Sequence, residues 1–160
     1  MNDEKKYTLS EAHHLFAVDF HSKTWDLLDK QGRTQDENER MLDYAHASLA
    51  HWRTAGAEIH HQRGEWLVAR VYTVLGDKTN AFAHAMRCME LHETNKHLMA
   101  DFDTAFTYEA VARACALSGD AAKAQEYIEK ARTAGESIAD EKDREAFFME
   151  FDGGEWNGRK

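Results

Sequence analysis

Residues 66–91, WLVARVYTVLGDKTNAFAHAMRCMEL, contain two amphipathic helical patterns that are separated by Gly76 and Asp77. Apolar residues recur at helical spacing on both sides of this break. They are Leu67, Val68, Val71, Tyr72 and Leu75 before it, and Ala81, Phe82, Ala85, Cys88 and Met89 after it. Glycine suits the left-handed residue that follows a helix, and aspartate suits the N-terminal cap of the next helix. The stretch therefore predicts a helix–turn–helix hairpin.

The same break recurs at Gly119 and Asp120, and a weaker copy turns at Gly32. The three glycines are 44 and 43 residues apart. Supersecondary units of nearly constant length that follow one another are typical of stacked helical repeats.

The composition favours an all-α fold, because the chain contains no proline and is rich in helix-forming residues. Its 160 residues are enough for one domain with a core of its own. The net charge of −9 argues against nucleic acids and anionic membranes as partners. The charged N-terminus contains neither a secretory signal nor a spanning helix, and we expect a cytoplasmic protein.

Helix boundaries can be placed from capping signals. Thr8 with Glu11 and Thr34 with Glu37 have the spacing of capping boxes. We expect one domain over residues 1–152, with helix pairs at about 8–56, 58–93 and 96–135, a terminal helix at about 140–151, and a flexible tail at 153–160. The terminal helix carries Phe147, Phe148 and Phe151, which either cover the end of the stack or form the contact of a homodimer.

The residues around Gly76 and Gly119 resemble the tetratricopeptide repeat. Small or aromatic residues stand at the positions that this family prefers: Ala69 and Ala112, Tyr72 and Cys115, Ala81 and Ala124, and Cys88 and Ala131. The unit around Gly32 departs from the pattern at Trp25, Glu37 and Tyr44. The resemblance implies antiparallel helix pairs stacked into a right-handed superhelix, whose first helices line a concave, peptide-binding groove.

A polar and aromatic stripe is expected along that groove, because its residues have spacings of three and four on each first helix. The stripe contains Asp19, Ser22, Asp26 and Asp29 in the first pair, Arg63, Trp66, Arg70 and Thr73 in the second, and Phe106, Glu109 and Arg113 in the third.

Two interpretations of this stripe remain open. The three arginines can clamp a carboxylate-bearing ligand, while Trp66 and Phe106 provide apolar contact. Alternatively, the arginines pair with the acidic side chains Asp19, Asp26 and Glu109, and only fix neighbouring hairpins against each other.

Catalytic and metal-binding patterns are weak. The spacing of His84, Cys88 and His92 follows one helix face but holds the outer two residues too far apart for one ion. His13-His14 and His60-His61 fit no metal-binding motif, and Cys88 and Cys115 are expected to be inert core thiols.

We therefore expect no catalytic residues, no metal and no cofactor. The favoured function is a non-catalytic module that binds a protein or peptide in the groove. The alternatives are a small-ligand-binding or enzymatic protein that uses the same Arg, Glu and His residues, and a homo-oligomeric scaffold.

Overall fold

The computed structural model describes residues 5–157, and within them helices are the only regular secondary structure, as predicted. The elements are α1 (Leu9–Leu28), α2 (Gln35–Ala55), α3 (Glu58–Leu75), α4 (Lys78–Thr94), the short 3-10 helix η1 (Lys96–Leu98), α5 (Asp101–Ser118), α6 (Ala121–Glu136) and α7 (Glu141–Asp152). No helix in this part of the chain combines the length and the apolar character that crossing a membrane requires.

Local signals in the sequence account for most helix ends. Both predicted capping boxes are present at Thr8 and Thr34. Gly76 and Gly119 adopt left-handed conformations with φ of 79° and 81°, which glycine reaches without strain. The aspartate after each glycine accepts a hydrogen bond from a backbone N–H of the following helix. The hairpin predicted from residues 66–91 is therefore confirmed, as is its copy at Gly119.

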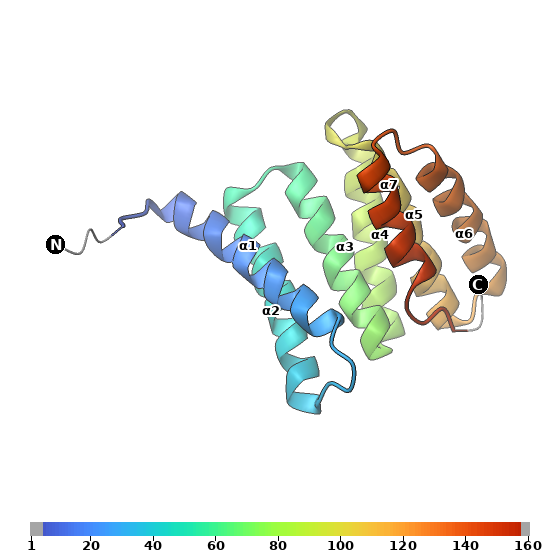
Figure 1. Ribbon diagram of the computed structural model, residues 1–160, viewed down its shortest axis with the longest axis horizontal. Helices are drawn as coiled ribbons and strands as arrows, with labels where there is room; N and C mark the ends of the chain where they lie inside the picture. Colours follow the sequence, from blue (N-terminus) through green and yellow to red (C-terminus); the bar gives the residue numbers. More distant parts are fainter. Residues whose placement is uncertain (1–4, 158–160) are drawn as a thin grey trace.

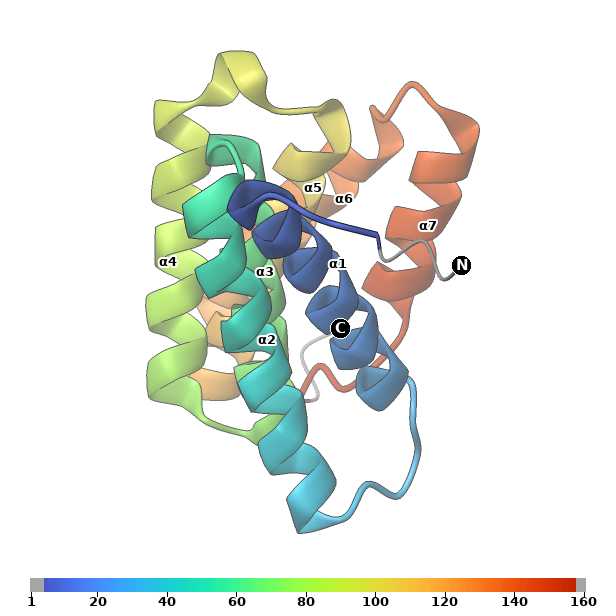
Figure 2. The same cartoon turned by 90° about the vertical axis from the view of Figure 1, so that its left-hand side faces the viewer.

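The helices pack as consecutive antiparallel hairpins, α1 with α2, α3 with α4 and α5 with α6. The pairs follow one another along the long axis of the molecule (Figure 1). Neighbouring pairs join through α2 with α3, α3 with α5 and α4 with α5. A view along the stack places α1 and α7 toward one side of the molecule and α4 toward the other (Figure 2). We call the side that carries α1, α3 and α5 the inner face.

The core has two parts. The larger part joins α2, α3, α4 and α5 with Ala124 of α6, and it includes Ala69, which is only 1 % exposed. Two other small residues expected at close helix crossings, Ala112 and Ala131, belong to the smaller part. The smaller part forms where α7 covers α5 and α6. Phe147 and Phe151 are fully buried there, which confirms that the terminal helix folds back onto the stack. Cys88 and Cys115 are buried free thiols, as expected.

Part of the segment for which we expect a flexible tail contacts the bundle. Among its described residues, 153–157, Trp156 is buried with 6 % exposure, whereas Gly154, Glu155 and Asn157 are exposed. The indole N–H of Trp156 donates to the carbonyl of Phe151 at 3.0 Å. A single tryptophan produces no helical periodicity, and this is why the sequence pattern did not place it in the core. Residues 158–160 lie outside the described part.

Candidate functional site

The inner face is built from the first helix of each hairpin, and most of its charged groups are already paired. Arg63 on α3 donates to both carboxylate oxygens of Asp103 on α5, at 2.8 and 3.0 Å. Asp103 is 2 % exposed and also accepts from the backbone N–H of Ala100, at the start of α5. The Arg63 guanidinium lies 4.8 Å from the centre of the Phe102 ring. This bidentate pair links the second and third hairpins.

A second cluster joins three of the predicted groove residues, Trp66, Glu109 and Arg113. The Trp66 indole N–H donates to one oxygen of Glu109 at 2.9 Å, and Arg113 donates to the other oxygen. Glu109 is completely buried and Arg113 is 1 % exposed. A buried carboxylate needs such partners, because an uncompensated charge in the interior is strongly unfavourable.

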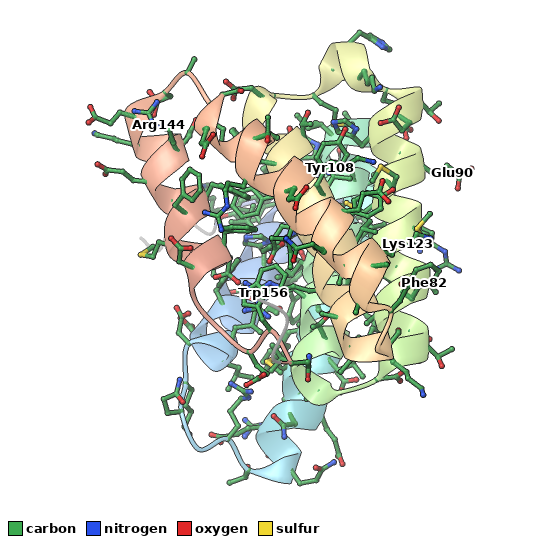
Figure 3. All side chains as sticks on the ribbon, turned by 90° about the vertical axis from the view of Figure 1, so that its right-hand side faces the viewer. Phe82, Glu90, Tyr108, Lys123, Arg144 and Trp156 are labelled. Atoms are coloured by element: carbon green, nitrogen blue, oxygen red, sulfur yellow. The ribbon has the colours of Figure 1, made fainter. Side chains whose placement is uncertain are left out.

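The last turn of α7 and the residues after it accept hydrogen bonds from Arg70 and Arg113. Arg70 donates to the Glu150 carboxylate at 2.6 Å. Arg113 donates to the main-chain carbonyls of Glu150, Gly153 and Glu155, at 2.8, 3.0 and 3.3 Å. Figure 3 shows Trp156 beside the end of α7, and its ring centre lies 4.1 Å from the Arg113 guanidinium.

The arginines therefore pair within the chain, but only one of the three predicted partners is right. Glu109 does pair with Arg113. The pairing expected for Asp19 and Asp26 is wrong: Asp19 pairs with Lys23 on its own helix, and Asp26 is exposed. The hydroxyl of Thr73 donates to the carbonyl of Ala69 and contributes to its own helix.

One part of the inner face remains open as a cavity of about 240 Å³ between α1, α3 and α5. Its lining consists of His21, Trp25, Gln62, Arg63, Trp66, Phe102, Asp103 and Phe106. Trp25 stacks on Trp66 with a centroid distance of 5.8 Å, and Phe106 meets Trp66 edge-on at 5.2 Å. The cavity therefore unites three predicted groove residues, Arg63, Trp66 and Phe106, with the aromatic side chains of Trp25 and Phe102, which the stripe did not contain.

The polar groups of this cavity carry no net charge. Arg63 and Asp103 compensate each other. Burial lowers the pKa of His21, so the imidazole is neutral at pH 7. Its Nε2 accepts from the Trp25 indole N–H at 3.1 Å, and its proton is therefore on Nδ1. The lining thus suits a neutral, apolar group.

Gln62 adds a buried acceptor to the lining. The Thr107 hydroxyl donates to the carbonyl of Asp103 at 2.6 Å, so its oxygen accepts from the Gln62 side chain at 2.8 Å. This fixes the amide nitrogen toward Thr107. The Gln62 Oε1 is then buried without a hydrogen-bond partner in the structure. Nothing in the helical stripe pointed to Gln62, because it lies one residue before Arg63 and shares the face of the core.

A separate polar network lies outside the inner face. Glu65 accepts from Arg53 at 2.6 Å and is 2.5 Å from Nδ1 of His84. Burial raises the pKa of the Glu65 carboxyl, but the hydrogen bond with His84 and the charge of Arg53 outweigh burial and lower it below its usual value. The Glu65 carboxylate thus finds its hydrogen-bond partners within the chain, as the arginines of the inner face do.

The Cys88 thiol is unreactive as a nucleophile, because burial raises its pKa to about 12 and keeps it protonated. Among residues 5–157, no group of three or more His, Cys, Asp or Glu side chains is arranged to hold a metal ion.

The fold and the site define an all-α protein of stacked hairpins with an aromatic cavity on its inner face. Searches against protein-family models, curated proteins and solved structures found no match to the chain.

Proposed function

We propose that the chain is a tetratricopeptide-like, right-handed helical-repeat module without catalytic activity, which binds a peptide segment of a partner protein on its inner face. The aromatic cavity between α1, α3 and α5 carries this proposal. It receives an aromatic side chain of the peptide, which packs against Trp25, Trp66 and Phe106 in the offset and edge-on arrangements that aromatic rings prefer.

The size of the cavity supports a peptide side chain over a whole small molecule. A cavity of about 150 Å³ accommodates benzene, whereas small-molecule sites span roughly 300–1,000 Å³. At about 240 Å³, this cavity lies between the two and fits one ring-sized group. The remainder of such a ligand lies along the helices outside the cavity, as an extended peptide can.

The chemistry of the lining supports the same class of ligand. Because Arg63 and Asp103 neutralise each other and His21 is uncharged, neither a cation nor an anion gains a free counter-charge inside the cavity. Four aromatic side chains provide the contact area instead. Buried aromatic anchors of this kind commonly supply most of the binding energy of an interface.

Selection from a random peptide library, followed by titration of the enriched peptides, tests the proposal. Enriched peptides should share an aromatic residue, and Trp25→Ala should weaken them by about 10-fold or more, the scale of a lost aromatic anchor. The matched control is Trp52→Ala, because Trp52 stacks on His60 at 4.4 Å and does not line the cavity.

Circular dichroism must show that both tryptophan variants remain folded. Peptides whose affinity falls equally in both variants would contradict the proposal, and so would a library that yields no binder. Preferential binding of free aromatic small molecules, with no gain from flanking peptide residues, would assign the cavity to a small ligand instead.

A further inference from the structure

The chain segment from Glu150 to Trp156 lies on the inner face in the way a bound peptide does. One guanidinium, that of Arg113, donates to three main-chain carbonyls of this segment, those of Glu150, Gly153 and Glu155. Glu150 to Asp152 form the last turn of α7, and the chain continues beyond the helix end at Gly153. Contacts to carbonyls do not depend on side chains, so another chain that follows the same course offers the same acceptors.

Phe151 of the segment is fully buried against Phe147 and Phe148 of α7, and two further side chains contact the arginines. Glu150 receives a charge-assisted hydrogen bond from Arg70. Six residues later, Trp156 places its ring over the Arg113 guanidinium and is nearly completely buried. The surface therefore distinguishes a carboxylate and an aromatic ring at a fixed separation.

The surface beneath the segment keeps its own internal bonds. Arg113 and Trp66 both donate to Glu109, and neither contact involves the C-terminal segment. Departure of the segment removes the carboxylate partner of Arg70 but leaves the buried Glu109 compensated. The cluster of Trp66, Glu109 and Arg113 is thus preformed, which lowers the cost of binding another segment.

An adjoining cavity shows that this surface continues past the segment. It measures about 400 Å³, and Arg33, Arg70 and Glu155 are in its lining. Arg33 donates to the carbonyls of Leu27, Leu28 and Lys30 and to the side chain of Asn38. It forms no ion pair with any carboxylate of residues 5–157. Without the carboxylates of the segment itself, Arg33 and Arg70 make this surface locally basic on a chain with a net charge of −9.

We propose that the segment from Glu150 to Trp156 is a ligand bound in cis, and that the surface formed by Arg70 and Arg113 is a second binding site. Its ligand is an acidic segment of a partner protein that ends a helix as α7 does, with a glutamate in the last helical turn and a tryptophan six residues later. This partner segment and the chain's own C-terminal segment compete for the surface. The inference is independent of the aromatic cavity, because Arg70 and Arg113 do not line it.

Gly154 offers a way to loosen the cis segment without touching the surface. It has a φ of +73°, and a Cβ there would lie 2.7 Å from Nη2 of Arg70 and 3.2 Å from Nη1 of Arg113. Gly154→Ala therefore disturbs the crossing of the segment over both arginines. Gly153→Ala is the matched control, because Gly153 has an ordinary φ of −89° and a Cβ there would approach only backbone oxygens, the nearest at 3.1 Å.

The probe is a fluorescein-labelled peptide with the sequence of residues 149–157, MEFDGGEWN, titrated with the full-length protein and followed by fluorescence polarisation. Gly154→Ala should bind this peptide about 10-fold more tightly than either the wild type or Gly153→Ala, because the site is then less occupied in cis. Adding Arg70→Ala to the Gly154→Ala protein should weaken binding by about 10-fold, the effect of a lost charge-assisted hydrogen bond. A peptide that carries Glu150→Gln and Trp156→Ala should not bind.

Equal affinity of the wild type, Gly153→Ala and Gly154→Ala proteins for the peptide would overturn the proposal, provided that circular dichroism shows all three folded. If Gly154→Ala does not fold, Glu150→Ala replaces it, because it removes only the ion pair with Arg70. A concentration-dependent dimer of Gly154→Ala that excludes the peptide would assign the surface to a second copy of the chain, and would equally overturn the assignment to a foreign segment.

Discussion

Replacing Arg113 by methionine tests the electrostatic core of the inner face. Arg113 and Glu109 are 1 % and 0 % exposed, and the substitution leaves the Glu109 carboxylate with the Trp66 indole N–H as its remaining hydrogen-bond donor. Removing one partner of a buried ion pair typically costs about 3–5 kcal/mol, because the other charge stays buried without compensation. For a domain of this size, each kcal/mol corresponds to about 2–4 °C in Tm. We therefore expect the melting temperature to fall by roughly 6–20 °C.

Urea unfolding followed by circular dichroism measures this loss. The informative control is the double variant Arg113→Met/Glu109→Gln, in which the remaining group is neutral and still accepts from Trp66. It should recover about 1–2 kcal/mol relative to the single variant, because the unpaired buried charge is gone. A single variant that loses less than about 1 kcal/mol would refute the reasoning. A double variant no more stable than the single one would also refute it.

Three further predictions concern packing and pH. Ala69→Leu should lower the free energy of unfolding by about 1–3 kcal/mol in urea titrations, because Ala69 is buried at a helix crossing. An unchanged free energy of unfolding would show that the repeat register is misplaced. Gly135→Ala should destabilise by roughly 1–3 kcal/mol, because a Cβ there would lie 2.3 Å from the Phe147 ring, and Phe147→Leu should relieve part of that loss in melting curves. Burial lowers the pKa of His21, so the unfolded chain binds its proton more readily than the folded one, and stability should fall as pH drops below about 6.5. His21→Gln should flatten that decline in Tm, and an identical pH profile would contradict the assignment.

Helix positions could be read from the sequence because their determinants are local. The capping boxes at Thr8 and Thr34 and the turn glycines Gly76 and Gly119 act within three or four residues of their own helix ends. Such signals do not depend on how the hairpins are placed relative to one another. The first helix shows the limit of these local signals. The sequence pattern places a turn at Gly32, but the helix ends four residues earlier, at Leu28, and Gly32 has the left-handed conformation.

The partners of the groove arginines depend on that placement and could not be read in this way. Shifting Arg63 by one repeat length leads to Phe106, but its partner is Asp103, one helical turn earlier. Trp66, by contrast, bonds to Glu109, which is one repeat length away. The spacing of the glycines therefore does not report which turn of α5 a long arginine side chain reaches. Arg70 pairs with Glu150, 80 residues away and on a helix outside the repeat pattern.

The sequence pattern predicted only part of the aromatic lining of the cavity, because the lining depends on how the hairpins are placed relative to one another. Trp66 and Phe106 belong to the predicted stripe, and the structure places both in the lining. Trp25 stood out in the sequence only as a departure from the small residue of a tetratricopeptide unit. That departure has a physical meaning, because the large side chain stacks on Trp66 and supplies one wall of the cavity.

Ionic strength separates the two binding surfaces that we propose. A ligand of the aromatic cavity meets a lining without net charge, so raising the salt concentration should leave its affinity nearly unchanged. An acidic segment on Arg70 and Arg113 gains from local positive charge, and its affinity should fall when ionic strength rises from about 0.05 to 0.5 M, since the Debye length then shrinks well below 10 Å. The affinity is measured at each salt concentration for two pairs. One is the Gly154→Ala protein with the MEFDGGEWN peptide, and the other is the wild type with a library-selected peptide. Equal salt dependence of the two peptides would mean that they share one surface, because two sites with such different charge cannot respond alike.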